Sequence, residues 1–543
     1  MNFILSKSSI FPRLSHRNAP REKYFGPTLK KFDSFKRILS GVAAAFLLGG
    51  CATVNWEYPR TPSVAFAHPE TTTVGALFGE AADKHPGLSG FSLVEYGENG
   101  FLARLAMIDL AEKTLDAQYY IWSSDTTGRI LASHLLRAAD RGVRVRILID
   151  DHYQTGDKDF LLAGLDGHPN IEIRLFNPIT NRFWRTLSFL ADFRRVNHRM
   201  HNKLLVMDNA VAIVGGRNIG DVYFGVEKDH NYRDMDVLTT GPIVRDLSAS
   251  FDVFWNSDFA IPVGATVEEL PTEKDWKAML KQLEENVSAA GYPYPIYQNV
   301  DDLRARLVQI RDNFIWGPGH VFVESPSRVE TSAEIGVIHQ ALSQRVSEVK
   351  HEILIESPYF VLPDQVIERV GQLTARGIKV RAMTNSAASS DVIAAQAGYA
   401  NTRVKLLKAG MQLYELRPDT NMERHWSVLS GKSRAAMHNK FIVFDRRSVF
   451  IGSFNLDPRS STLNTEIGVM IDSPEIASQA AKIMDEGIAP GSAYYVTLDS
   501  NDNLTWTAEN NGEKVQYDAD PETKAWERLV LDLIGMLPIE DQL

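Results

Sequence analysis

His201-Asn-Lys203-Leu-Leu-Val-Met-Asp208 is the stretch that decides the fold, because it occurs again 237 residues later as His438-Asn-Lys440-Phe-Ile-Val-Phe-Asp445. Each copy continues through a turn into a second apolar run, which is Val211-Ala-Ile-Val-Gly-Gly-Arg-Asn218 in the first copy and Ser448-Val-Phe-Ile-Gly-Ser-Phe-Asn455 in the second. This composition predicts a strand–turn–strand hairpin in each copy.

The spacing within each copy divides its residues into two groups. Residues two apart on a strand share a face, so His201 lies beside Lys203 and His438 lies beside Lys440. The aspartate follows its histidine by seven positions and points to the opposite face, where we expect it to hold the turn. The motif as a whole gives the predicted catalytic set, with the two aspartates in this supporting role: His201, Lys203, Asp208, His438, Lys440 and Asp445.

The repeat extends well beyond the motif. Arg141-Gly-Val-Arg-Val-Arg146 matches Arg376-Gly-Ile-Lys-Val-Arg381, and Gly241-Pro242 matches Ser473-Pro474, in the same order around the two motifs. Landmarks spread over about a hundred residues indicate that a whole domain is duplicated, whereas a short solenoid repeat has a period of a few tens of residues.

Each copy alternates helical and strand patterns. Helices are expected over 102–113, 128–141 and 365–375, and strands over 114–122, 143–149, 351–359 and 378–384. This order predicts an α/β fold with one sandwich domain per half, related by a pseudo-twofold axis, and an active site between them. The predicted divisions are a signal peptide (1–50), a linker (51–74), the first domain (75–261), a connecting insertion with two helices and no assigned role (262–314), the second domain (315–490), and a C-terminal hairpin and helix (491–543).

Two copies of a histidine beside a lysine suit the chemistry of a phosphodiester. A neutral imidazole can attack phosphorus, and a second histidine can protonate the leaving oxygen and then activate the acceptor. The lysines, together with Asn218 and Asn455, would stabilise charge on the equatorial oxygens. This scheme requires no metal and no cofactor. One half supplies only one histidine, so the two halves have to meet.

Each histidine also needs a group that fixes its tautomer. Asp234 and Glu466 occupy equivalent positions, eight residues before a matched proline. We therefore expect Asp234 to orient His201 and Glu466 to orient His438, each within its own half. The alternative is that both are solvated acids at strand ends.

These motifs together resemble the phospholipase D superfamily, and the likeness covers nearly all of the chain after its N-terminal segment. The resemblance implies a phosphohistidine intermediate with His201 as nucleophile and His438 as general acid and base, an order that the sequence itself leaves open. It further implies phosphatidylglycerol as a substrate, phosphatidylethanolamine as a candidate donor and cardiolipin as the product. A similarity to the bacterial cardiolipin synthase C type rests on Ala117-Gln-Tyr-Tyr-Ile-Trp122, Leu175-Phe-Asn-Pro178, Arg199-Met-His-Asn-Lys203, Gly215-Gly-Arg-Asn-Ile-Gly-Asp221 and Asp457-Pro-Arg-Ser460.

The N-terminal segment indicates a lipoprotein. Residues 1–50 carry nine Lys and Arg against two Asp and Glu, and the apolar stretch over 38–50 ends at Leu48-Gly49-Gly50-Cys51. This stretch is shorter than the ~20 residues that span a membrane, and it fits a signal peptide. We expect the single cysteine, Cys51, to be lipidated and to anchor the protein in a cell-envelope membrane, facing the periplasm. An uncleaved anchor or a buried hydrophobic start is the alternative.

The charge of the remaining chain argues against nucleic acid as a partner, because 49 Lys and Arg stand against 66 Asp and Glu after residue 50. Against this background a basic and aromatic cluster precedes the first motif. It predicts either a loop that contacts the membrane or a lipid headgroup, or an ordinary basic helix covering the sheet. The cluster contains Arg182, Trp184, Arg185, Arg194 and Arg195.

The C-terminal helix is expected to begin after an N-cap at Asp520, with Pro521 in its first turn. Its apolar face includes Trp526, Leu529 and Leu533, and packing on the body is favoured over docking on lipid.

The leading hypothesis is a membrane-anchored phosphatidyltransferase that acts on phospholipids. The alternatives are a hydrolytic phospholipase D with water as acceptor, a periplasmic nuclease, which the acidic body disfavours, and a catalytically silent lipid-binding scaffold. The oligomeric state has no signal in the sequence.

Overall fold

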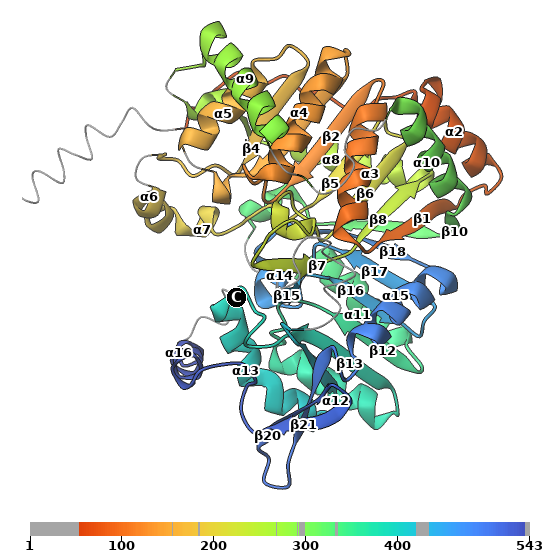
Figure 1. The fold of residues 1–543 in the computed structure, drawn as a ribbon, viewed down its shortest axis with the longest axis vertical. Coiled ribbons are helices and arrows are strands. Elements are labelled where there is room, and N and C mark those ends of the chain that lie inside the picture. The colour runs from red at the N-terminus through yellow and green to blue at the C-terminus, as the bar shows by residue number, and fades with distance from the viewer. Residues whose placement is uncertain are drawn as a thin grey trace, which may run out of the picture. The chain divides into compact units, whose positions relative to one another are not determined.

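The computed structural model of the chain describes residues 54–154, 156–182, 185–267, 269–289, 292, 299–331, 335–419 and 434–537. These residues form two large mixed sheets and one two-stranded sheet (Figure 1). The predicted signal peptide, Cys51 and Trp184 lie outside the described residues.

In sheet order, the first sheet contains β10 (Ile315–Gly317), β1 (Ser89–Val94), β8 (Asp236–Thr240), β6 (Val211–Gly215), β5 (Leu204–Met207), β2 (Thr114–Tyr119), β3 (Arg144–Asp150), β4 (Ile171–Phe176) and β9 (Ala260–Pro262). The second contains β11 (Gly319–Val323), β18 (Ile467–Ile471), β17 (Ser448–Gly452), β16 (Phe441–Phe444), β12 (Glu352–Glu356), β13 (Lys379–Asn385), β14 (Gln412–Leu416), β19 (Ala493–Leu498), β20 (Leu504–Asn510) and β21 (Glu513–Tyr517). The small sheet pairs β7 (His230–Arg233) with β15 (Arg434–Met437).

The two large sheets repeat one another strand for strand. The order β8-β6-β5-β2-β3-β4 in the first corresponds to β18-β17-β16-β12-β13-β14 in the second. In each sheet the last three of these strands are parallel and the others pair antiparallel. This shared order confirms the prediction of two α/β domains that arose by duplication.

The helices follow the same duplication around the sheets. Those of the first half and the insertion are α2 (Thr73–Asp83), α3 (Gly97–Leu110), α4 (Thr126–Asp140), α5 (Gly156–Asp166), α6 (Arg185–Ala191), α7 (Phe193–Val196), α8 (Pro242–Trp255), α9 (Glu273–Ala289) and α10 (Val300–Asp312). Those of the second half are α11 (Val337–Glu348), α12 (Asp364–Ala375), α13 (Ile393–Lys408), α14 (Pro458–Thr462), α15 (Pro474–Gly487) and α16 (Ala525–Gly535).

Alternate residues of the central strands face two different cores, because successive side chains on a strand point to opposite faces. On β5, Leu205 and Met207 join a core that includes α3 and α4, whereas Leu204 and Val206 face a second core. The second core contains residues of both sheets together with α8 and α15, so it joins the two halves. A third core covers the other face of the second sheet, beneath α12 and α13.

The chain passes from the first sheet to the second at Pro318, the one residue between β10 and β11. β10 pairs with β1 in the first sheet, and β11, which begins two residues after β10 ends, pairs with β18 in the second. The insertion before β10 forms the two predicted helices, α9 and α10. Both pack on the first half, α9 against α4 and α5, and α10 against α3.

The C-terminal region differs from its prediction in two respects. The hairpin of β19 and β20 gains a third strand, β21, which extends the second sheet. The last helix begins at Ala525 and not at Asp520, because the Asp520 carboxylate accepts a hydrogen bond from Arg403 at 2.7 Å. The helix is capped instead by Lys524, whose backbone N–H donates to Glu527 at 2.8 Å.

The prediction that the apolar face of α16 packs on the body is wrong for most of that face. α16 contacts α13, and Asn401 donates to the carbonyl of Gly535 at 2.9 Å. Trp526, Leu529 and Leu533 are nevertheless 60%, 58% and 55% exposed. No helix among the described residues is long and apolar enough to cross a membrane.

Candidate active site

Both histidine–lysine pairs lie in extended segments that lead directly into a hairpin. β5 begins immediately after Lys203, and β16 begins immediately after Lys440. β5 pairs with β6 and β16 pairs with β17, so each predicted hairpin is present. The reactive residues therefore lie at the entrance of a hairpin whose strands are central in a buried sheet.

The motif aspartates bind backbone at the far ends of these strands. The carboxylate of Asp208 accepts three backbone N–H groups, and that of Asp445 accepts three at equivalent positions. Both residues have a φ of 51°, which suits the tight turn that joins the two strands of a hairpin. These contacts fit the supporting role predicted from strand parity, and the absence of Asp208 and Asp445 from the reaction stays a prediction. The donors are Glu112, Lys113 and Thr114 at 3.0, 2.8 and 2.7 Å, and Lys350, His351 and Glu352 at 2.9, 2.8 and 2.9 Å.

The backbone of each motif histidine is bound by the opposite half. The N–H of His201 donates to the carbonyl of Thr465 at 2.9 Å, and the N–H of His438 donates to the carbonyl of Arg233 at 2.7 Å. In each case the acceptor is the residue that precedes a predicted orienting acid. Each histidine is thereby placed beside the acid of the other half.

The predicted pairing of histidines with acids of their own half is therefore wrong. Nδ1 of His201 lies 2.9 Å from Oε2 and 3.1 Å from Oε1 of Glu466. Nδ1 of His438 lies 2.5 Å from Oδ2 of Asp234. Both carboxylates are fully buried. Asp234 and Glu466 are orienting groups, as predicted, but each half orients the imidazole of the other.

Burial holds both imidazoles in the neutral form. It lowers the pKa of His201 to about 4, although the Glu466 carboxylate opposes this shift. Burial also lowers the pKa of His438 well below its usual value, and the charge of Lys440 adds to the effect. Because Nδ1 of each ring faces a carboxylate, Nε2 is the nitrogen available for a substrate. A neutral imidazole in this tautomer can attack phosphorus.

Lys203 and Lys440 place two buried amines beside the imidazoles. The Nζ of each donates to the carbonyl oxygen of its own motif histidine at 2.6 Å. Burial lowers the pKa of Lys440 to about 8, and it lowers that of Lys203 well below the usual value, although carboxylates oppose both shifts. A phosphodiester anion entering this low-dielectric site stabilises the charged form of both amines, and they in turn attract it.

Asn218 and Asn455 occupy equivalent positions but make different contacts. Asn218 accepts from the N–H of Ile121 at 3.1 Å and donates to the hydroxyl of Tyr223 at 3.0 Å. The ring of Tyr223 lies 5.3 Å from that of His438, so Asn218 also positions an aromatic wall of the site. Asn455 is buried, and its Oδ1 has no hydrogen-bond partner in the described part of the chain. Contact of either amide with phosphate oxygens stays a prediction.

Three residues that contact His201 or Glu466 were not predicted from the sequence. The ring of Tyr120 lies 5.0 Å from that of His201. The hydroxyls of Ser453 and Ser460 both donate to the carboxylate of Glu466, the latter at 2.8 Å. Ser453 lies within the second motif copy, where the first copy has glycine, so this difference between the copies was a usable signal.

The basic cluster before the first motif is largely tied to the body. Arg182 and Arg185 both pair with the buried carboxylate of Asp151, at 2.6 and 3.3 Å. Arg195 pairs with an aspartate on its own helical segment at 2.6 Å. Arg194 is exposed on α7. A contact of this cluster with membrane or headgroups stays a prediction, and three of its arginines also have structural roles.

The two halves of the chain match one family model twice. Residues 105–255 and 342–488 match the model described as cardiolipin synthase, PLD-like domain. Cardiolipin synthase C of Escherichia coli (strain K12) is 36% identical over 463 residues, which cover 84% of this chain and 97% of the relative. Cardiolipin synthase A of Pectobacterium carotovorum subsp. carotovorum (strain PC1) is 23% identical over 455 residues, covering 81% and 78%.

A solved structure shares the fold. The crystal structure of phosphatidylserine synthase from Haemophilus influenzae Rd KW20 superposes with a TM-score of 0.54 at 14% identity, covering 86% of this chain and 100% of that one. Together with the duplicated histidine–lysine site, these similarities show that the chain belongs to the phospholipase D superfamily, as a cardiolipin synthase-like enzyme.

Proposed function

We propose that the chain makes cardiolipin by transferring a phosphatidyl group to phosphatidylglycerol. The observation that carries the proposal is the pair of neutral imidazoles, each oriented through Nδ1 by a buried carboxylate and each beside a buried lysine. This set suits a two-step exchange at a phosphodiester. The names of the relatives, cardiolipin synthases A and C, support the substrate class.

In the first step, Nε2 of His201 attacks the phosphorus of the donor phospholipid. A P–N bond forms while the P–O bond to the headgroup alcohol breaks, and His438 gives a proton to the leaving oxygen. The phosphodiester anion raises the pKa of His438, because it adds negative charge beside a ring that burial otherwise keeps neutral, and Nε2 of His438 takes up this proton from water as the substrate binds. Lys203 and Lys440 stabilise the negative charge on the phosphoryl oxygens.

In the second step, a hydroxyl of phosphatidylglycerol gives its proton to His438 and attacks the phosphorus. The P–N bond breaks, His201 is regenerated and cardiolipin is released. The by-product reports the donor, since phosphatidylglycerol as donor releases glycerol and phosphatidylethanolamine as donor releases ethanolamine.

The two carboxylates support His201 as the nucleophile. Burial raises the pKa of Glu466, but His201, the charge of Lys203 and the hydroxyl of Ser453 together outweigh this effect and leave the pKa below its usual value. The pKa of Asp234, in contrast, is raised by burial. An ionised Glu466 keeps the proton of His201 on Nδ1, which leaves the lone pair of Nε2 free to attack.

Product analysis tests this function. The purified protein is incubated with vesicles of phosphatidylglycerol and phosphatidylethanolamine whose acyl chains differ in mass, and the lipids are analysed by mass spectrometry. We expect cardiolipin together with glycerol or ethanolamine. Phosphatidate as the sole lipid product would identify a hydrolase and would refute the transfer reaction.

We also propose that lipidated Cys51 anchors the protein in a cell-envelope membrane, facing the periplasm. The basic and apolar segment that ends at Cys51 supports this attachment, as does the exposed apolar face of α16, which suits a lipid surface. Cells that express the wild type should incorporate labelled palmitate into the protein, and the Cys51→Ala variant should not. Equal labelling of both would contradict the anchor.

A further inference from the structure

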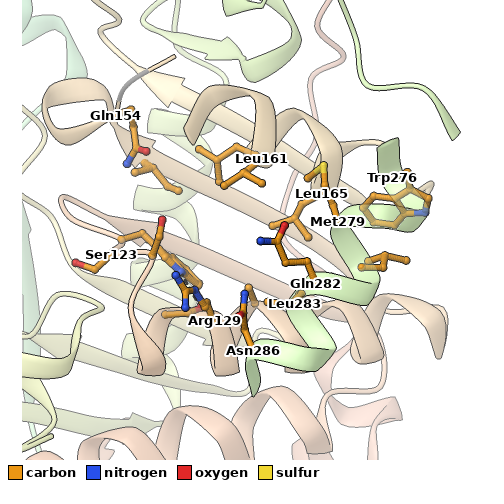
Figure 2. A pocket seen from close by; sticks show the side chains of 17 residues that line it. Ser123, Arg129, Gln154, Leu161, Leu165, Trp276, Met279, Gln282, Leu283 and Asn286 are labelled. Carbon is orange, nitrogen blue, oxygen red and sulfur yellow. Dashed lines mark hydrogen bonds between the residues drawn. The ribbon is translucent and has the colours of Figure 1, made fainter. Parts of the chain in front are cut away.

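Outside the catalytic centre, the first half holds a cavity of about 190 Å³ between α4, α5 and α9 (Figure 2). Apolar side chains from all three helices line it. They include Ala132 on α4, Leu161 and Leu165 on α5, and Met279 and Leu283 on α9. The cavity opens to the surface, because Leu161 is 43% exposed.

This cavity gives the insertion a role. Trp276, Met279, Leu280 and Leu283 recur at helical spacing along α9, so they lie on one face, and all four line the cavity. α9 also packs against α4 and α5. The insertion therefore closes an apolar space that the duplicated domain alone would leave open.

One wall of the cavity carries an unsatisfied polar group. Gln154 is 2% exposed, and its Nε2 has no hydrogen-bond partner among the residues that the structure describes. In Figure 2 its amide points toward the space that the apolar side chains surround. A buried donor without an acceptor is costly, so Gln154 indicates a ligand that brings an oxygen acceptor attached to an apolar chain.

This wall adjoins the catalytic centre. Gln154 directly follows Tyr153, whose ring lies 5.5 Å from that of Tyr120, and Tyr120 in turn lies 5.0 Å from His201. Trp122, two residues after Tyr120, lines the cavity as well. A molecule whose phosphorus is at His201 can thus extend toward Gln154 past these aromatic rings.

We infer that the cavity binds one acyl chain of the substrate phospholipid, with the ester carbonyl accepting a hydrogen bond from Nε2 of Gln154 and the first part of the chain between α5 and α9. The inference rests on the proposed function for the identity of the lipid. In a phospholipid the ester carbonyl is a few bonds from phosphorus, which matches the order of His201, Tyr120 and Gln154. Apolar cavities of roughly 150 Å³ hold a benzene ring, so this one accommodates about six to eight carbons and the rest of the chain stays outside.

The first test varies acyl length. Ala132→Phe fills the cavity, and Ala103→Phe is its matched control, because Ala103 on α3 lines a separate cavity of about 270 Å³ beside α10. Total phospholipid consumption is measured with butanoyl and octanoyl phosphatidylglycerol in detergent micelles, whatever the products. Each buried methylene contributes about fourfold in binding. We therefore expect the octanoyl-to-butanoyl ratio of kcat/KM to fall at least tenfold in Ala132→Phe and to stay unchanged in Ala103→Phe.

The second test uses ether-linked phosphatidylglycerol, which lacks the ester carbonyl. Gln154→Leu should lower kcat/KM about fivefold to tenfold for the ester lipid and leave it unchanged for the ether lipid. A merely structural role of Gln154 would reduce both rates equally, and that result would overturn the assignment. An unchanged chain-length ratio in Ala132→Phe would overturn it as well.

Two further experiments separate this inference from two alternatives: a free fatty acid as the ligand, and a protein that consumes no phospholipid. If a free fatty acid is the ligand, added octanoate will alter the rate of the wild type and not the rate of Ala132→Phe. The octanoyl-to-butanoyl ratio of kcat/KM will then be the same in both proteins. That outcome overturns the assignment of the cavity to the substrate. If the wild type consumes no phospholipid, the proposed function fails. The cavity is then tested with a phospholipid that carries a photoreactive acyl chain. Labelling of the α9 peptide in the wild type and not in Ala132→Phe supports the inference, and any other labelling pattern overturns it.

Discussion

The two catalytic histidines have the same backbone setting and different chemical surroundings. Both receive a carboxylate from the opposite half, and both donate a backbone hydrogen bond to the residue before that carboxylate. Glu466 is further bound by two serine hydroxyls, whereas Asp234 lies against Gly216, where an added Cβ would be 2.0 Å from its Oδ1. The duplication kept the scaffold, and the side chains around each acid set its protonation. One site thus holds two imidazoles that can perform different tasks.

The largest expected effect comes from removing either imidazole. We expect His201→Ala and His438→Ala each to lower kcat about 10⁴-fold or more, because each step needs both rings. Trapping of a labelled phosphatidyl group after acid quench separates the roles. His438→Ala should still label His201 when the donor has a good leaving group, and His201→Ala should not be labelled. Label on His438 in the His201→Ala variant would reverse the assignment.

The carboxylates test the comparison more directly. Glu466→Gln should lower kcat by roughly 10²- to 10⁴-fold, because the amide cannot hold the His201 proton on Nδ1 in the reactive tautomer. Asp234→Asn should cost about tenfold less, since the raised pKa of Asp234 makes its carboxyl easier to replace by a neutral group. Steady-state rates of both variants under the same conditions check this order. Equal losses would show that the two acids are equivalent.

The pKa values predict a pH profile. The activity of the free enzyme should rise as pH increases through about 4, where His201 loses its proton and becomes nucleophilic. It should fall as pH increases through about 8, where Lys440 loses the charge that binds the phosphodiester. In Lys440→Arg the alkaline limb should move to higher pH, because guanidinium stays charged, until the lowered pKa of Lys203 becomes limiting. If the alkaline limb of Lys440→Arg stays at the pH of the wild-type limb, Lys440 is excluded as the source of that limb.

The motif aspartates should produce the smallest effects, and these should be on stability. Asp208→Ala leaves three backbone donors without their acceptor beside a fully buried side chain, so the free energy of unfolding should fall by about 2–3 kcal/mol. For Asp445→Ala we expect about 1–2 kcal/mol, because two of its donors lie at exposed positions. Thermal unfolding measures both, and the pH profile of the folded variants should match the wild type. A shifted profile would place the aspartates in the reaction.

The two α/β domains could be predicted from the sequence because each is marked by short local patterns, and these patterns occur twice. The hairpins, the strands and helices of each half and the insertion helices follow from periodicity within short segments. The parity of Asp208 against His201 also separated the aspartate from the imidazole, as the structure places them, since alternation is a property of a single extended segment.

The crossed pairing could not be predicted in the same way. Asp234 and Glu466 lie at equivalent positions of the repeat. Their spacing in the sequence is therefore the same whether each acid faces the histidine of its own half or that of the opposite half. The choice is made through space, by the parallel pairing of β7 with β15 and by the bridge between Met200 and Thr465. The start of α16 was missed for a related reason, because Asp520 is a good N-cap by sequence but binds Arg403, 117 residues away.

The exchange of carboxylates also has a consequence for biosynthesis. Once the first half has left the ribosome, it can form its sheet, yet His201 has no acid at Nδ1 until Glu466 has been translated and the second half has folded. His438, which is made later, finds Asp234 already in place. The nascent chain therefore cannot orient the imidazole of His201 before Glu466 has been made, 265 residues later in the sequence.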